Sequence, residues 1–435
     1  MSENRLDVGF IPVEVPGRSG TGATQTSTLL IEHLSRRHNL TVYVSSQRSG
    51  DPDTLPATDR VEYVIHDELP WLPHPIPEKQ AAVAGELSSL ERHDLVHSYS
   101  SAFIPTLANL ATPTLVTLNS YLALCPKADF RYRGTTNCTG PGRLKCAECV
   151  PATAINRRQG VISELKAGYF SLGRFPLVWR SMQSADDITQ YQALSPHLRE
   201  DYVRNGFPAD RIAVIPHFYD ERFLVNATET QNGPNQPARL LYVGALQDIK
   251  GVDVLIRALP HLIERGIDFE LEIVGSGPLE DRLKRQAVDF GVDSYIEWTG
   301  RLEYEVLPER YRAADCFVYP GLLDEPFGRV MLEAMASRTP IASSDIGSMS
   351  HIVGPTGTCF EPGDPGALAS AIDGILEEYS TYTAHIDEQL ARFAPDRVID
   401  RFDRLYHRTA GSQSGDKSES AHDLDPAPGC WELRQ

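Results

Sequence analysis

The sequence predicts an α/β protein with two doubly wound, Rossmann-like domains, and three observations lead to this prediction. The chain of 435 residues is too long for one ordinary core and fits two domains of about 200 residues each. Short β-branched and aliphatic runs alternate with helical patterns, which is typical of parallel β/α units. The alternation stops in a polar stretch with Pro and Gly at residues 226–238 and then begins again, so we interpret that stretch as a linker.

The expected strands form two series. In the expected N-terminal domain, residues 1–225, they are residues 8–11, 42–44, 61–65, 95–97 and 115–118. In the expected C-terminal domain, residues 239–390, they are residues 240–243, 271–274, 296–298, 316–319 and 340–342. Open sheets of this kind bind ligands at the carboxyl ends of their strands, and we expect the functional residues there.

The composition, with 41% hydrophobic and 23% charged residues, is that of an ordinary globular protein. No apolar run is long enough to span a bilayer, and the polar residues 1–7 lead directly into the first strand. We therefore expect no signal peptide and a cytoplasmic location. The net charge of -18 argues against nucleic acid as a partner, because an acidic surface repels the phosphate backbone.

The most informative run of residues begins at Glu325 and ends at Glu333, eight positions later. Pro326 and Gly328 stand just before an apolar stretch that starts at Val330, which indicates a loop followed by a helix. Unpaired N–H groups and the helix dipole favour an anion at such a junction, and phosphate is the natural one. Two carboxylates beside a phosphate could bind hydroxyls on either side of a diphosphate, which suggests a sugar nucleotide. A lone Glu pair at this spacing could also be a solvated helix face.

With Phe327 and Gly328 inside it, this run resembles the glutamate pair of the GT4 family of retaining glycosyltransferases (glycosyltransferase group 1). Residues 314–320 and 340–347 resemble the family too, and the resemblance covers roughly residues 5–408. It implies the GT-B fold, in which two Rossmann-like domains face a cleft and the first lies on the acceptor side. It also implies that residues 391–409 form a helix that returns to the first domain. The composition of residues 410–435 predicts a disordered tail.

The resemblance implies a function: transfer of a sugar from a nucleotide-diphosphate sugar to a glycan, a glycolipid or another hydroxyl acceptor, with retention and without a catalytic metal. Glu325 would contact hydroxyls of the transferred sugar, and Glu333 would bind the ribose hydroxyls. The diphosphate would be received by backbone amides of the loop and helix start, at Phe327, Gly328, Arg329 and Val330.

Further donor contacts follow from the same resemblance. Lys250 matches a lysine that grips the diphosphate, whereas Ala245 stands where the family has an arginine. Gly22 belongs to a short glycine-rich stretch that resembles the loop near the donor's phosphates, although an ordinary strand-to-helix turn would look the same. Segments that contain Gly275 and Arg301 match family segments near the base. Lys250 could also be a plain surface lysine at a helix start.

Retention in this family is usually described as attack from the same face, with the leaving phosphate helping to deprotonate the acceptor. Asn119 stands where a histidine commonly follows a strand; it cannot take a proton but can position a sugar hydroxyl. Glu325 and Asn119 are thus the candidate catalytic residues. His97 ends another strand and is either a cleft residue or a core histidine. Metal-dependent transferases hold their ion with a strand-end Asp-X-Asp, and the two such triplets here, residues 51–53 and 423–425, fall in an expected loop and the tail.

A cysteine-rich insert is expected at residues 125–149. It contains Cys125, Cys138, Cys146 and Cys149, and the last two form a Cys-X-X-Cys pair. In a cytoplasmic protein this spacing favours a metal over disulfides, and a structural zinc is the main hypothesis. An iron–sulfur cluster and free thiols are the alternatives.

Residues 157–182 are rich in Arg and Lys with aromatic residues between them. An amphipathic stretch of this kind can lie on an anionic membrane, and this gives a possible peripheral contact at the inner face of the membrane. The alternative is a helix that packs its aromatic side chains into the first domain.

Two functions from different classes are compatible with these residues. An active glycosyltransferase requires Glu325, Glu333 and Lys250, which are all present. A catalytically silent protein that binds a sugar nucleotide or glycan as the partner of an active enzyme would show losses such as Ala245 and Asn119.

Overall fold

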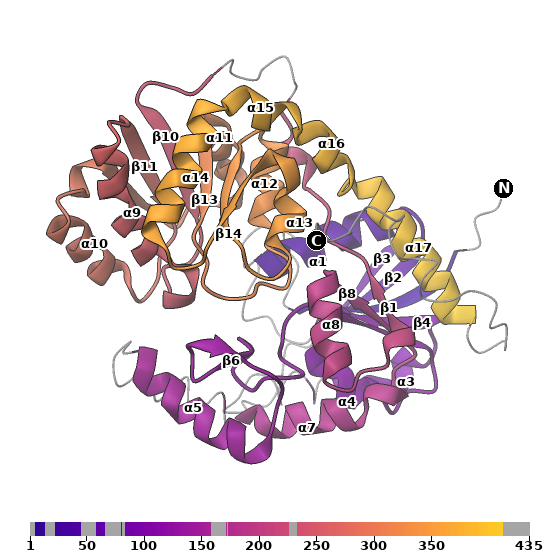
Figure 1. The fold of residues 1–435 in the computed structure, drawn as a ribbon. Coiled ribbons are helices and arrows are strands. Elements are labelled where there is room, and N and C mark those ends of the chain that lie inside the picture. The colour runs from indigo at the N-terminus through magenta and orange to yellow at the C-terminus, as the bar shows by residue number, and fades with distance from the viewer. Residues whose placement is uncertain are drawn as a thin grey trace. The chain divides into compact units, whose positions relative to one another are not determined.

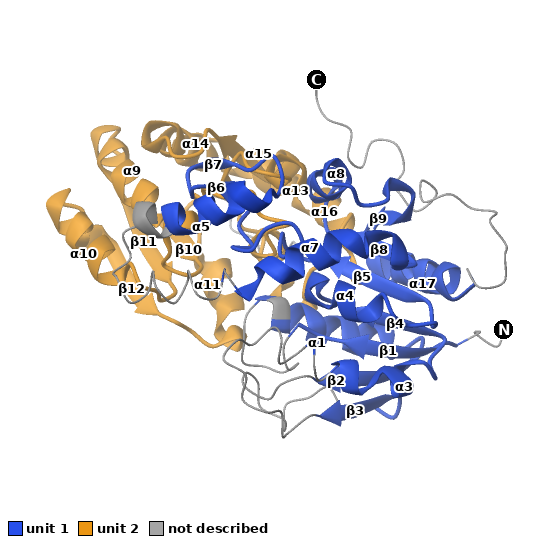
Figure 2. Ribbon diagram, turned by 90° about the horizontal axis from the view of Figure 1, so that it is seen from below, with its two compact units in different colours: residues 1–217, 396–435 blue, residues 218–395 orange. Residues whose placement is uncertain are grey.

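The computed structural model describes residues 5–13, 22–44, 58–65, 80, 83–157, 171, 173–225 and 233–411 (Figure 1). By internal contacts the chain divides into two compact units (Figure 2). The first unit is residues 1–217 together with 396–435, and the second is Phe218–Pro395. The predicted glycine-rich stretch before residue 22, the start of the linker and the tail beyond Gly411 lie outside the described residues.

The first unit contains a seven-stranded sheet with the order β3-β2-β1-β4-β5-β8-β9, in which all neighbours are parallel. Its strands are β1 (Asp7–Ile11), β2 (Asn39–Val44), β3 (Val61–Ile65), β4 (Leu95–Ser98), β5 (Thr114–Leu118), β8 (Gln190–Ala193) and β9 (Ile212–Val214). Its helices are α1 (Gly22–Leu34), α3 (Leu87–Leu90), α4 (Ile104–Leu107), α5 (Arg143–Arg157), α7 (Phe175–Gln183), α8 (Pro196–Arg204) and α17 (Pro395–Gly411). A small antiparallel ribbon, β6 (Arg131–Tyr132) with β7 (Thr136–Asn137), precedes α5.

The second unit contains a six-stranded parallel sheet with the order β12-β11-β10-β13-β14-β15. Its strands are β10 (Ala238–Val243), β11 (Phe269–Val274), β12 (Ile296–Gly300), β13 (Cys316–Tyr319), β14 (Ile341–Ser344) and β15 (Gly357–Phe360). Its helices are α9 (Val252–Glu264), α10 (Glu280–Asp289), α11 (Leu307–Ala313), α12 (Val330–Ala336), α13 (Met349–Val353), α14 (Pro365–Glu377), α15 (Tyr379–Ala384) and α16 (Ile386–Ala391). Apolar side chains of α9 and α14 pack with alternate residues of β10 and β11 into one core. Two doubly wound parallel sheets are thus present, as predicted.

The first unit ends at His217, earlier than the predicted residue 225, and the physical reason is backbone pairing. Tyr219 N donates to Phe393 O (3.2 Å) and Val225 N to Ala336 O (3.1 Å), so residues 218–225 belong to the second unit. The chain rejoins the first unit at Asp396, within α17.

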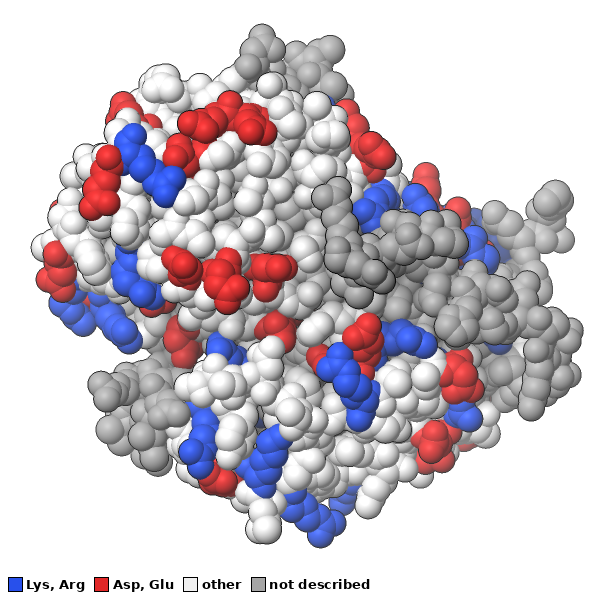
Figure 3. Space-filling view, viewed as in Figure 1, with Lys and Arg blue, Asp and Glu red and all other residues white. Residues whose placement is uncertain are grey.

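The surface carries charges of both signs. In Figure 3, Lys and Arg side chains are scattered among Asp and Glu over the face that is shown. Among the described residues we find no helix that combines the length and the apolar composition needed to cross a bilayer.

Candidate functional site

The carboxyl ends of β10, β11 and β12 meet closely in the second unit. Gly275, which follows β11, has φ +144°, and a Cβ placed on it would lie 1.8 Å from Gly244 O. Gly275 N donates to Gly300 O (2.8 Å) and Gly244 N to Val274 O (3.0 Å). Only glycine fits such a backbone contact, so the structure gives the predicted residue Gly275 a steric reason.

Gly275→Ala is expected to destabilise the protein by about 3 kcal/mol or more, because the added methyl overlaps a backbone carbonyl that cannot move alone. Gly374→Ala is the matched control: this glycine lies inside α14, no described residue lies within 4 Å of the added Cβ, and Ala should stabilise the protein by about 0.5–1 kcal/mol. Urea denaturation measures both. A Gly275→Ala protein as stable as the wild type would show that the contact is not rigid.

Lys250 and Glu325 come together although they are 75 positions apart. Lys250 ends a single helical turn, Asp248–Lys250, and the following Gly251 (φ +68°) would place a Cβ 1.8 Å from Pro320 O. Leu322 N donates to Ile249 O (2.9 Å), so this turn packs against the loop after β13. As a result Lys250 Nζ donates to Glu325 Oε1, with the two side chains 24% and 20% exposed.

The Lys250 ammonium decides the charge of Glu325. Burial alone would raise the pKa of the Glu325 carboxyl, but the attraction of Lys250 outweighs it and holds the pKa below its usual range. Two tyrosines that prediction from sequence missed lie nearby, Tyr242 in β10 and Tyr319 in β13. Burial and then the charge of Glu325 raise the pKa of both phenols. The buried Tyr319 hydroxyl interacts with the Glu325 carboxylate and helps Lys250 to keep the pKa of Glu325 low.

The side chain of Phe327 anchors the loop between Glu325 and Glu333. Phe327 is buried and packs edge-on against Phe393, with ring centroids 5.9 Å apart, so only its backbone is placed to meet a ligand. Gly328 has φ +82°, a conformation that favours glycine. Arg329 and Val330 follow it at the start of α12, which is seven residues long.

Glu333 lies in α12 and is buried, with its carboxylate bound by three side chains. Tyr304 Oη donates to Oε1 (3.3 Å) and Tyr311 Oη to Oε2 (3.1 Å). Arg329 forms an ion pair with Oε1, with Nε at 3.3 Å. Burial raises the pKa of Glu333, and Arg329 opposes that effect. No sequence pattern indicated the two tyrosines, which lie just before α11 and within it.

Two predicted residues belong to the first unit. Asn119 follows β5, and its Oδ1 atom is buried with no hydrogen-bond partner among the described residues. Gly22 begins α1, and none of the described residues lies within 4 Å of an added Cβ, so these residues show no steric need for glycine there. His97 is a core residue: its ring nitrogens lie 2.7 Å from Tyr406 Oη and 2.8 Å from Thr117 Oγ1, and burial lowers its pKa to about 3.

Comparison with known proteins finds a family match that lies within the second unit. Residues 226–392 match the family described as "Glycosyl transferases group 1". The chain carries a group 1 glycosyltransferase domain. The phosphatidyl-myo-inositol mannosyltransferase of Mycolicibacterium smegmatis is 30% identical over 204 residues, which are 46% of this chain and 52% of that protein. The chain thus spans about half the length of the curated relatives it matches.

The similarity to solved structures extends over nearly the whole chain, although the sequence identity is low. The sucrose-phosphate synthase of Thermosynechococcus elongatus has a TM-score of 0.68 at 19% identity and covers 94% of this chain and 100% of that chain. HepE of Anabaena, solved with UDP, has a TM-score of 0.62 at 16% identity and covers 94% and 99%. These similarities show the fold, and they confirm the predicted GT-B architecture of two Rossmann-like domains.

The cysteines of the insert do not form the predicted zinc site in this structure. The four thiols are free, and among the described ranges no three metal-binding side chains lie together in an arrangement that could hold an ion. The sulfurs are instead engaged locally: Cys138 Sγ donates to Gly140 O (3.4 Å), and Cys149 Sγ accepts from Arg133 N (3.1 Å). Burial, followed by the charge of Asp129, raises the pKa of the Cys125 thiol to about 12.

The predicted basic and aromatic stretch is only partly described, since residues 158–170 and 172 lie outside the described ranges. Its last part forms α7, in which Leu177 and Val178 are buried. Arg174, which precedes α7, donates from Nη1 to Pro126 O (3.5 Å) and is partly buried. These contacts agree with the packed-helix interpretation for the described part of the stretch.

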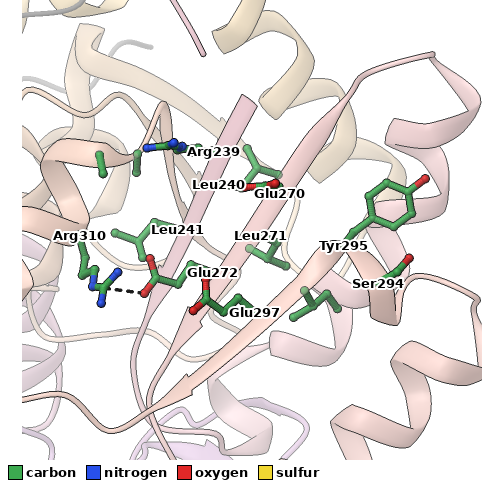
Figure 4. A pocket seen from close by; sticks show the side chains of 13 residues that line it. Arg239, Leu240, Leu241, Glu270, Leu271, Glu272, Ser294, Tyr295, Glu297 and Arg310 are labelled. Carbon is green, nitrogen blue, oxygen red and sulfur yellow. Dashed lines mark ion pairs between the residues drawn. The ribbon is translucent and has the colours of Figure 1, made fainter. Parts of the chain in front are cut away.

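A pocket of about 410 Å³ lies on the glycosyltransferase domain, over the amino-terminal halves of β10, β11 and β12 and beside α11 (Figure 4). Glu272 and Glu297 are opposite each other on neighbouring strands, and Arg310 Nε lies 3.6 Å from Glu272 Oε1. Burial raises the pKa of Glu272, against the effect of Arg310. None of the predicted donor residues lines this pocket, so it is separate from the candidate site.

Proposed function

We propose that the protein is a retaining glycosyltransferase that moves a sugar from a nucleoside-diphosphate sugar to a hydroxyl of a glycan, a glycolipid or another acceptor, without a catalytic metal ion. The observation that carries the proposal is the pairing of Lys250 with Glu325 beside the carboxyl ends of β10 and β13. A cation and a carboxylate at this edge of the sheet suit a ligand with both phosphate and hydroxyl groups.

The pair suggests a division of roles. Glu325 stays ionised because Lys250 lowers its pKa, so it acts as an acceptor for the hydroxyls of the sugar and not as a general acid. Lys250 supplies positive charge for the diphosphate, which becomes more negative as it leaves. Since Ala245 replaces the family's arginine, this contribution depends on Lys250 more heavily. The backbone amides of residues 328–330 are proposed to receive the diphosphate, and the conformation of the loop at Gly328 favours glycine there.

The proposed acceptor residue is Asn119, because its buried Oδ1 atom has no partner in the described part of the chain. A hydroxyl of the acceptor would donate to it, while the leaving phosphate takes the proton of the attacking hydroxyl. The name of the mannosyltransferase that resembles this chain suggests a glycolipid as one acceptor to test.

Calorimetric titration of UDP, GDP and ADP in the presence of EDTA tests the donor site. We expect one nucleotide to bind in the micromolar range, and Lys250→Met to weaken that binding about tenfold or more. Nucleotide binding without sugar transfer would favour the silent-partner alternative. If no nucleotide binds the wild-type protein, the proposal is wrong. Proton NMR of the product then shows whether the anomeric configuration of the sugar is retained.

A further inference from the structure

We infer that Arg329 and Tyr304 are positioning residues that hold the Glu333 carboxylate in place for the donor's ribose, and that Asp220 in turn holds Arg329. This inference rests on the proposed function, because it concerns how Glu333 is prepared to bind a nucleotide. It assigns the Arg329 side chain a role distinct from that of its backbone amide.

The first step is the state of Glu333 itself. Its side chain is 7% exposed, and protein groups bind both carboxylate oxygens, Tyr304 and Arg329 at Oε1 and Tyr311 at Oε2. A carboxylate offers about four acceptor positions, so these contacts fix its orientation and leave about one position for a ligand hydroxyl. Glu333 is therefore preorganised, because its rotamer is set before any ligand arrives.

The second step is the state of Arg329, which is 10% exposed. Its Nη2 donates to Tyr304 Oη (2.5 Å), and that same hydroxyl donates to Glu333. Arg329 thus acts on the carboxylate directly and through Tyr304, and consecutive hydrogen bonds of this kind strengthen one another. The guanidinium carbon also lies 5.5 Å from the centre of the Tyr304 ring.

The third step is the anchor behind Arg329. Asp220 Oδ2 lies 3.9 Å from Arg329 Nη2, and Asp220 accepts hydrogen bonds from Arg222 Nε (3.0 Å) and Nη2 (2.6 Å). The Arg222 guanidinium lies 5.0 Å from the Tyr304 ring. Asp220, Arg329 and Glu333 are largely buried, and the more exposed Arg222 adds a second positive charge, so two arginines balance two carboxylates. This balance matters because an unpaired buried charge is costly.

A cluster that only stabilised the fold would show the same contacts, so the test must measure how strongly the protein recognises the ribose hydroxyl. Calorimetry would compare the Kd of the nucleoside diphosphate that binds the wild type with the Kd of its 2′-deoxy analogue. We expect the wild type to prefer the ribonucleotide roughly tenfold, the range for a hydrogen bond to a charged group. Arg329→Met should reduce this preference to about twofold or less. Glu333 then loses its ion pair with Arg329, and Tyr304 loses the hydrogen bond from Arg329 that helps to orient its hydroxyl.

Two further variants make the result decisive. Tyr304→Phe removes a single hydroxyl, is expected to fold, and should lower the ribose preference to an intermediate value. Arg338→Met is the matched control: Arg338 is 11% exposed and bonded to Asp387 in the same unit, and its loss should leave the preference unchanged. If Arg329→Met and Tyr304→Phe both bind with the wild-type preference, the inference is overturned while the proposed function stands. If the wild type binds no nucleotide, the proposed function fails, and the inference fails with it.

Discussion

Glu325→Gln is expected to lower the rate of sugar transfer about a thousandfold, while the protein stays folded and still binds the nucleoside diphosphate. The amide keeps the shape of the side chain but loses the negative charge and one acceptor oxygen. Lys250 then loses the carboxylate with which it pairs, although the packing of Gly251 against Pro320 keeps the turn that carries Lys250 beside this loop. Loss of a charged contact at the reacting sugar typically removes about 3–4 kcal/mol of transition-state stabilisation.

The measurement is release of nucleoside diphosphate from the cognate donor at saturating acceptor, together with the Kd of the nucleotide. Glu297→Gln is a suitable control, since Glu297 is an exposed carboxylate of the same unit that lines the separate pocket. A Glu325→Gln protein with more than a tenth of the wild-type rate would remove Glu325 from the reaction. A rate that falls together with the nucleotide affinity would indicate a binding residue instead.

Asp315→Ala is expected to destabilise the second unit by about 3–5 kcal/mol, the largest stability effect that we anticipate. Asp315 is fully buried between α11 and β13. Its carboxylate accepts from Arg239 N (2.7 Å), Asn235 N (3.1 Å) and Asn235 Nδ2 (3.0 Å). It thereby ties the start of β10 to the start of β13, and removal leaves buried donors without an acceptor.

Urea denaturation of Asp315→Ala and Asp315→Asn tests this expectation, with the asparagine variant losing about half as much because one carbonyl acceptor remains. Asp364→Ala provides a calibrated comparison: Asp364 caps α14 by accepting from Gly366 N (2.8 Å) and Ala367 N (3.0 Å), and its loss should cost about 1 kcal/mol. An Asp315→Ala protein that loses no more than this capping variant would contradict the argument.

Local sequence patterns predicted most of the strands of both sheets. Each of the ten predicted strands overlaps an observed one, because β-branched and aliphatic runs between helices mark buried parallel strands. Among the strands that were missed, β6, β7 and β9 are only two or three residues long. β8 contains two glutamines, and β15 begins with a glycine and is only partly buried. Their place in the sheets depends on pairing with β5 and β14, which no local pattern encodes.

The sequence by itself determined the two doubly wound sheets, and it predicted that Gly275 follows a strand and that Glu325 and Glu333 lie in a loop and in the helix after it. Only the tertiary structure decided that Lys250 meets Glu325 and that Tyr304, Tyr311 and Arg329 surround Glu333. It also decided that the insert's thiols bond to nearby groups instead of gathering around a metal. The physical reason is range: residue periodicity reports which face of an element is buried, whereas the partners of a polar side chain depend on the path of the whole chain.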